Sequence, residues 1–163
     1  MPLIAPEFSH LKSYEDNRGE LYPCWRKRNS KINFVEDRFS RSKKGVVRGF
    51  HGDSTTYKLC TCVYGELFLV LWDIENKVRY EYTLTEKNKL QVLVPPNFLN
   101  AHQCLSSECI LFYKWSEYYG GPESQWSINY KDPDINVEWP VDKVTLSGRD
   151  QGSKFLSQVD YFD

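Results

Sequence analysis

Short runs of aromatic and β-branched residues alternate with clusters of turn residues along most of the chain. Residues 57–63 form one such run, Tyr64-Gly65-Glu66 form a turn, and residues 67–72 form a second run. Two apolar runs joined by a short turn that contains glycine are typical of a β-hairpin. The pattern therefore predicts a pair of antiparallel strands here.

Similar runs recur between Asp, Asn, Gly and Pro residues, and they predict further strands at residues 78–84, 90–94, 110–115 and 126–129. No segment has the periodicity of a long amphipathic helix. Many short strands at this spacing favour an all-β, antiparallel sandwich, jelly roll or barrel. Because a small closed sheet can hold one ligand at its mouth, we predict a jelly roll with a central cleft and few short helices.

The length and composition predict one globular domain. The chain has 163 residues, of which 40% are apolar and 15% aromatic, and this is enough to bury a core without disulfides or metal. It has no internal repeat, low-complexity stretch or Gly/Ser linker. We therefore predict a single domain over residues 1–163, with residues 1–12 and 151–163 as appendages.

The charge balance excludes the classes of protein that bind through a strong overall field. Lys and Arg number 21 and Asp and Glu number 22, which gives a formal net charge of -1. The basic run Arg26-Lys27-Arg28 is interpreted as a solvated turn. We predict neither a nucleic-acid nor a membrane partner. The sequence start lacks the features of a secretion signal and no run reaches membrane-spanning length, so a cytoplasmic location is expected.

The cysteines and histidines do not have the spacing of a metal site. Five cysteines lack paired spacings, which favours a reducing compartment, and Cys60 and Cys62 share one face of a predicted strand as small hydrophobic residues. Many jelly-roll proteins bind metal through a His-x-His pair, but His51 is followed by Gly52 and Asp53, and the chain has only three histidines. We therefore predict no metal and no cofactor.

Residues 48–51 (RGFH) place His51 at the end of a strand, where its side chain can face the interior. Lys58 follows seven residues later, and Tyr113 and Asp150 lie far downstream. These residues supply a base, a cation, an acid and an orienting carboxylate. Together they are the groups needed to remove a proton beside a ketone and to return it from the opposite face, which is the chemistry of an epimerase.

Several longer motifs occur in order along nearly the whole chain: Asp16-Asn17-Arg18-Gly19, residues 40–51 (SRSKKGVVRGFH), Lys58-Leu59, Val94-Pro95, Tyr113-Lys114, Asp132-Pro133 and residues 146–150 (LSGRD). On these motifs the chain resembles the dTDP-4-dehydrorhamnose 3,5-epimerase family. The resemblance implies a cupin-type jelly roll without metal, a homodimer that exchanges N-terminal strands, and a nucleotide-activated 4-keto-6-deoxy sugar as substrate.

The resemblance also implies roles for single residues. His51 resembles the family's base, and Asp150 resembles the carboxylate that pairs with it. Lys58 resembles the lysine that stabilises an enolate, and Tyr113 resembles the general acid. The predicted substrate-binding residues are Arg48, Arg18 from the partner subunit, Arg38, Glu20, Asn100, His102 and Tyr119.

Some positions depart from the family's pattern. Asn100 stands where the rhamnose-pathway relatives usually carry histidine, and Glu36 and Arg38 replace amide-bearing residues. Glu20 begins a segment that is rich in aromatic residues in those relatives. Alternation places His102 on the same strand face as Asn100, so it either lines the pocket or bonds inside the core. These departures indicate a different nucleotide or sugar.

Other motifs resemble one branch of the family more closely, the epimerases that act on GDP-6-deoxy-4-keto-heptoses in capsule biosynthesis. They are Gly52-Asp53, residues 56–59 (TYKL), residues 61–66 (TCVYGE) and Asn100-Ala101-His102. We therefore predict an isomerase that inverts C3 of such a GDP sugar, with C5 left open. The alternatives are a dTDP-4-keto-6-deoxyhexose 3,5-epimerase, a 3,4-ketoisomerase, whose usual His-Ala-His start is absent, and a non-catalytic sugar-nucleotide-binding jelly roll.

Overall fold

The structure, a computed structural model, describes residues 5–162. Within this range, twelve strands form two five-stranded sheets and one hairpin. The strands are β1 (Glu7–His10), β2 (Tyr14–Asp16), β3 (Gly19–Leu21), β4 (Glu36–Lys43), β5 (Val47–Gly52), β6 (Lys58–Tyr64), β7 (Glu66–Asp73), β8 (Val78–Thr85), β9 (Leu90–Val94), β10 (Phe98–Cys104), β11 (Glu108–Trp115) and β12 (Trp126–Ser127). The helical segments are α1 (Gly148–Gln151) and the 3-10 turns η1 (Lys27–Asn29), η2 (Pro122–Ser124) and η3 (Leu156–Gln158).

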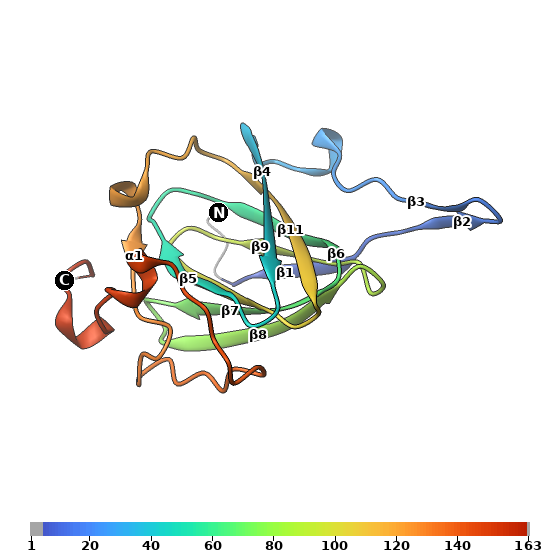
Figure 1. Cartoon of the computed structure of the whole chain (residues 1–163). Helices are drawn as coiled ribbons and strands as arrows, with labels where there is room; N and C mark the ends of the chain where they lie inside the picture. The colour runs from blue at the N-terminus through green and yellow to red at the C-terminus, as the bar shows by residue number, and fades with distance from the viewer. Residues whose placement is uncertain (1–4, 163) are drawn as a thin grey trace.

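The two five-stranded sheets pack face to face (Figure 1). The first has the strand order β1-β9-β6-β11-β4, and the second has the order β12-β5-β10-β7-β8. All strand pairs in them are antiparallel, and most neighbours are distant in the sequence. The prediction of an all-β antiparallel jelly roll with few short helices is confirmed.

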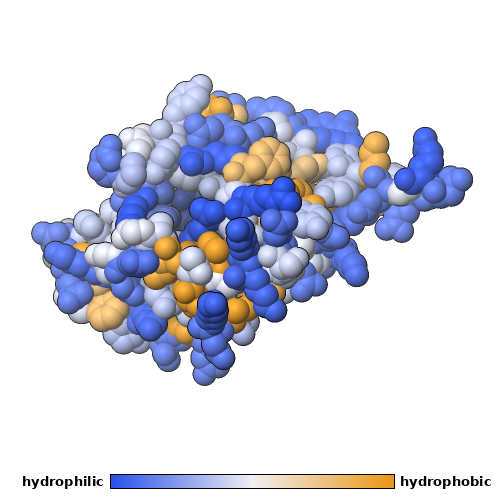
Figure 2. Space-filling model, viewed as in Figure 1, coloured by the Kyte–Doolittle hydropathy of each residue, from blue (hydrophilic) through white to orange (hydrophobic). Residues whose placement is uncertain are grey.

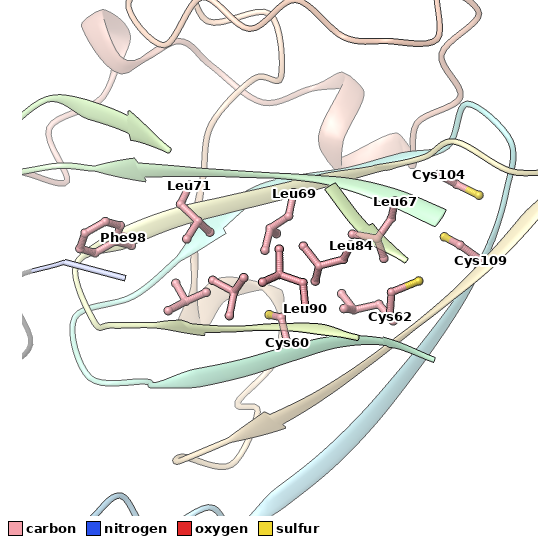
Figure 3. Packing of buried hydrophobic residues seen from close by; sticks show 13 residues of the cluster. Cys60, Cys62, Leu67, Leu69, Leu71, Leu84, Leu90, Phe98, Cys104 and Cys109 are labelled. Carbon is pink, nitrogen blue, oxygen red and sulfur yellow. The ribbon is translucent and has the colours of Figure 1, made fainter. Parts of the chain in front are cut away.

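The main core lies between the two sheets (Figure 3). β7 shows how the sequence builds it: Leu67, Leu69 and Leu71 point into this core, while Val70 and Trp72 point to a second cluster on the other side of the sheet. Because both faces of β7 are covered, its sequence is a continuous apolar run. Cys60 and Cys62 are buried side by side in the main core as small apolar residues, as predicted.

Both ends of the described chain contact the sheets, although the sequence led us to treat them as appendages. β1 adds an edge strand by pairing with β9. In the C-terminal segment, the backbone N–H of Leu156 donates a hydrogen bond of 2.7 Å to Asp132 Oδ2, and Val159 and Phe162 pack on the second cluster. The tail therefore covers the outer face of the second sheet.

The β2–β3 hairpin projects away from the rest of the chain (Figure 1) and carries mostly hydrophilic side chains (Figure 2). All six of its strand residues are exposed. Its position matters for function because two residues predicted to bind substrate, Arg18 and Glu20, lie on it. In residues 5–162, no helix is both long enough and apolar enough to cross a membrane.

Candidate active site

A cavity of about 450 Å³ opens between the two sheets. Its walls carry side chains from β5 and β10 of the second sheet, from β4, β6 and β11 of the first sheet, and from the segment around α1. Nine of the predicted site residues line it: His51, Tyr113, Asp150, Lys58, Arg48, Arg38, Asn100, His102 and Tyr119. The cavity is therefore the candidate active site.

His51 and Asp150 form a hydrogen-bonded pair at one wall of the cavity. His51 Nε2 lies 2.7 Å from Asp150 Oδ1, and the other carboxylate oxygen accepts a bond of 3.2 Å from the backbone N–H of Gly49. A carboxylate only accepts hydrogen bonds, so Nε2 carries the proton and Nδ1 carries the lone pair. Among residues 5–162, Nδ1 has no hydrogen-bond partner. The pair therefore presents a free imidazole nitrogen, the arrangement that a general base requires.

Two hydrogen bonds hold the segment that carries Asp150 in place. Ser147 caps α1 by accepting a hydrogen bond of 3.1 Å from the Asp150 N–H, and the Thr145 carbonyl accepts a bond of 3.0 Å from Val47 on β5. Burial alone raises the pKa of Asp150, but the hydrogen bonds from His51 and Gly49 and the charge of Arg149 bring it below its ordinary value. Asp150 is therefore a carboxylate at neutral pH.

Gly49 permits this arrangement because its backbone has a φ of +121°, a conformation that side chains disfavour. A Cβ atom at this position would lie 2.5 Å from the Asn100 carbonyl oxygen and 2.7 Å from the Ala101 Cβ. The close approach of β5 to β10 therefore excludes any side chain here.

Gly49→Ala is expected to lower the free energy of unfolding by about 2 kcal/mol or more, because strain and overlap add. Thermal or urea unfolding measures this change. Gly148→Ala is the matched control, since its added Cβ would meet no atom within 4 Å, and it should change stability by less than about 0.5 kcal/mol. Equal losses in the two variants would contradict the steric argument.

Lys58 extends from β6 into the cavity and is only 3% exposed. Its Nζ donates a hydrogen bond of 3.0 Å to Asn100 Oδ1 and lies 4.5 Å from the centre of the Trp115 ring. Asn100 is also the register partner of His51 on β5, so it connects the lysine to the histidine. Burial lowers the pKa of Lys58 from its ordinary value to about 8. The ammonium is thus close to its titration point near neutral pH.

Activity is expected to fall as pH rises through about 8, because the neutral lysine no longer stabilises a developing anion. A profile of kcat/KM against pH tests this, and Lys58→Met should be slow at every pH without that alkaline decrease. An unchanged alkaline decrease in Lys58→Met would assign that decrease in activity to another group.

The lowered pKa of Lys58 also affects stability. Between about pH 8 and its ordinary pKa, the folded protein binds fewer protons at Lys58 than the unfolded chain, so the contribution of this residue to the free energy of unfolding increases as pH rises.

Tyr113 projects into the cavity from β11, which belongs to the sheet opposite that of His51. Burial raises the pKa of its hydroxyl above the ordinary value, and the positive charge of Arg38 partly offsets this. The phenol is therefore protonated at neutral pH and can donate. Trp115 lies beside it, with ring centres 6.0 Å apart, and Tyr119 packs edge to face on Trp115 at 5.6 Å.

Asn100 and His102 both face the cavity from β10, which confirms that they share a strand face. His102 is 4% exposed, and burial, with smaller effects from Arg48 and His51, lowers its pKa to about 3. The ring is therefore neutral. Its Nε2 is buried without a hydrogen-bond partner among residues 5–162. A buried ring nitrogen without a partner is a site where a ligand or water can bind.

Arg48 lines the same cavity and is fixed by β4. Its Nε donates a hydrogen bond of 2.9 Å to Ser42 Oγ, and its Nη2 donates one of 3.1 Å to the Arg41 carbonyl. These bonds leave the remaining N–H groups of the Arg48 guanidinium available to an anionic ligand.

Arg18 and Glu20 are not brought to this cavity within one chain. Arg18 pairs with Asp16 in the hairpin, and Glu20 pairs with Lys89 at 2.6 Å. Sequence reasoning also missed cavity residues, namely Trp115, Gln125 and Arg149. Within residues 5–162, no cluster of three or more His, Cys, Asp or Glu side chains is placed to hold a metal ion.

The arrangement can carry out proton transfer at a carbon. One wall provides the lone pair of His51, the opposite sheet provides the Tyr113 hydroxyl, and Lys58 provides a buried positive charge. A proton removed beside a carbonyl leaves an enolate, which the ammonium would stabilise. An acid and a base on opposite walls can reach opposite faces of a flat intermediate.

Comparisons with known proteins agree with this chemistry. Residues 7–158 match the family model described as dTDP-4-dehydrorhamnose 3,5-epimerase. The chain is similar to the dTDP-4-dehydrorhamnose 3,5-epimerases of Shigella flexneri (34% identity, 93% of this chain and 91% of the relative) and Methanothermobacter thermautotrophicus (33%, 96% and 89%). Among solved structures, it resembles the dTDP-6-deoxy-D-glucose-3,5-epimerase of Legionella pneumophila in complex with dTDP-4-keto-L-rhamnose, with a TM-score of 0.89, 34% identity, and coverage of 95% of this chain and 89% of that one.

Proposed function

Because the chain belongs to the dTDP-4-dehydrorhamnose 3,5-epimerase family, a family of isomerases, we propose that it inverts C3 and C5 of a dTDP-linked 4-keto-6-deoxy sugar. The observation that carries the proposal is the 2.7 Å pair of His51 and Asp150, which shares a cavity with the Lys58 ammonium and the Tyr113 hydroxyl. These are the groups that a proton-abstracting epimerase needs.

In the proposed mechanism, His51 Nδ1 takes the proton from the carbon beside the ketone, and the electrons of the broken C–H bond move onto the ketone oxygen. Lys58 stabilises this enolate. Tyr113 then gives its hydroxyl proton to the same carbon from the opposite face, so a new C–H bond forms with inverted configuration. Water returns a proton to Tyr113 and removes one from His51, which is 22% exposed in its side chain.

The nucleotide in this proposal differs from the one the sequence led us to predict. The relatives named above carry dTDP in their names, and the Legionella structure holds a dTDP sugar. None of them supports the prediction of a GDP-6-deoxy-4-keto-heptose, so the dTDP alternative is preferred. Asn100 remains the feature that points to altered sugar recognition, since it lies in the cavity and binds Lys58.

The test is incubation with dTDP-linked and GDP-linked 4-keto-6-deoxy sugars in heavy water, followed by mass spectrometry. Two carbon-bound deuterons in the dTDP series are expected. One deuteron would restrict the activity to a single carbon, and uptake only in the GDP series would restore the heptose-type substrate. A 3-keto product would identify a 3,4-ketoisomerase. Nucleotide binding without any deuterium uptake would overturn the proposed epimerase activity and favour a non-catalytic binding protein.

We also propose that two copies form a homodimer in which Arg18, and with it Glu20, reaches the partner's cavity. The hairpin that carries both residues supports this, because it projects away from the rest of the chain (Figure 1) and neither residue lines the cavity of its own chain. Large apolar side chains are exposed near the hairpin and on the two edge strands of the first sheet: Phe8 (63%), Tyr14 (52%), Leu21 (68%) and Phe39 (68%). Tyr14 and Leu21 are register partners in the hairpin, and this exposed apolar pair is the part of the surface that favours a partner.

Light scattering during gel filtration measures the mass of the protein in solution, and a mass of one chain would overturn the proposed dimer.

Mixing Arg18→Ala and His51→Asn proteins under conditions that exchange subunits tests the shared site. If Arg18 acts in the partner's cavity, mixed dimers contain one cavity with neither change, and part of the activity returns. No recovery in confirmed mixed dimers would place Arg18 outside the partner's site.

A further inference from the structure

Arg38 and Tyr113 are direct partners across the β4–β11 pair. In an antiparallel sheet, such partners project on the same face about 5 Å apart, here into the cavity. The Arg38 guanidinium carbon lies 6.0 Å from the centre of the Tyr113 ring. A positive charge thus stands beside the ring whose hydroxyl the proposed mechanism uses as its acid.

Aromatic rings hold this guanidinium in place. Its carbon lies 4.3 Å from the centre of the Tyr119 ring and 5.0 Å from the centre of the Trp115 ring, both within cation–π range. Among residues 5–162, the Arg38 guanidinium donates one hydrogen bond, from Nη1 to Glu36 Oε2 at 3.4 Å. The side chain is 31% exposed, and both the ion pair with Glu36 and the stacking on the two rings position its charge.

Given the proposed epimerase function, we propose that Arg38 is a positioning residue that acts through Tyr113. When Tyr113 gives its proton to the enolate carbon, the O–H bond breaks, the C–H bond forms, and the oxygen of Tyr113 is left negatively charged. The adjacent guanidinium stabilises this tyrosinate until water protonates it. Arg38 therefore sets how often an enolate is protonated by Tyr113, with inversion, and how often His51 returns the proton, with retention.

Other charged and titratable groups also face Tyr113, and they make separable contributions. Arg48 on β5 lowers the pKa of Tyr113, as Arg38 does, and Cys60 on β6 raises it. Arg38 also lowers the pKa of Lys58. Removing Arg38 should therefore leave Lys58 at least as positively charged as before. Enolate formation should persist, while protonation by Tyr113 should weaken.

The experiment measures two rates on one substrate in heavy water: deuterium uptake by mass spectrometry and inversion by NMR of the sugar protons. In Arg38→Gln, uptake should stay within about threefold, while inversion should fall by about tenfold or more, because the tyrosinate left by the proton transfer loses its neighbouring positive charge. Arg38→Lys, which keeps the charge, should recover part of the inversion. Arg41→Gln is the matched control, because this arginine of the same strand is exposed and pairs with Glu108.

A double variant separates action through Tyr113 from a general effect. In Tyr113→Phe/Arg38→Gln, inversion should be no slower than in Tyr113→Phe alone, since the group on which Arg38 acts is already absent. Equal losses of uptake and inversion in Arg38→Gln, additive losses in the double variant, or no loss at all would overturn the role of Arg38. Absence of uptake by the unaltered protein would instead overturn the proposed function, and the role of Arg38 with it.

Discussion

His51→Asn is expected to lower the rate of deuterium uptake by the substrate by about 10³-fold or more, because the protein loses the base that removes the proton. Asparagine is smaller than histidine, and its amide ends short of the position of Nε2, so the 2.7 Å bond to Asp150 Oδ1 is lost. Asp150 keeps the hydrogen bond of 3.2 Å from the Gly49 N–H, so the carboxylate is not left buried without a partner, and the fold should remain intact. Mass spectrometry after timed incubation in heavy water measures the rate.

His10→Asn is the matched control. His10 is exposed on β1, where its Nδ1 lies 2.8 Å from the Asn88 carbonyl, and it is outside the cavity. This variant should take up deuterium at the normal rate. Calorimetry with dTDP should give similar affinities for the unaltered and His51→Asn proteins, because the imidazole acts on the sugar. Normal uptake in a folded His51→Asn protein would exclude His51 as the base.

The interior strands could be predicted because their sequences are apolar on the faces that the fold covers. The expected runs coincide with β7, β8 and β9 to within a residue at each end. β4 and β10 are not among the runs that the hydrophobic pattern predicts, although Asn100 and His102 were expected to share a strand face, and the reason is functional. Arg38 on β4 and Asn100 and His102 on β10 interrupt the hydrophobic pattern because they line the cavity. Ser42 on β4 interrupts it as well, and its hydroxyl accepts the hydrogen bond from Arg48.

The candidate site depends on contacts that no local pattern contains. His51 and Asp150 are 99 residues apart, and only the docking of α1 beside β5 brings them together. The motifs suggested this pair through a resemblance, whereas its geometry comes from the fold. Trp115 could have been found, since it lies two residues after Tyr113 and so shares its strand face. Gln125 and Arg149 lie outside the strands, where alternation gives no signal.

In the proposed mechanism the two sheets divide the chemistry between them. The second sheet presents the proposed base on β5, and the first presents the proposed cation on β6 and the proposed acid on β11. A flat enolate held between the sheets would therefore have one face toward His51 and the other toward Tyr113. Removing the Tyr113 hydroxyl should therefore leave proton removal by His51 in place.

Tyr113→Phe is accordingly expected to separate exchange from inversion. His51 can still remove the proton, exchange it with heavy water and return a deuteron to the same face. Uptake should therefore persist, while inversion should fall by about 10²-fold or more, the usual contribution of a general acid. The Tyr113 ring packs against Trp115, with the ring centres 6.0 Å apart, and phenylalanine preserves that packing. NMR of the sugar protons distinguishes the deuterated starting configuration from the inverted product.

Tyr118→Phe provides the comparison, because this tyrosine is 76% exposed and does not line the cavity. It should exchange and invert at normal rates. If Tyr113→Phe inverts normally, the proton must reach the second face from another donor, such as water. If it loses uptake together with inversion, the hydroxyl is needed to form the enolate, and Tyr113 would then act on the ketone oxygen beside Lys58 and not on the carbon.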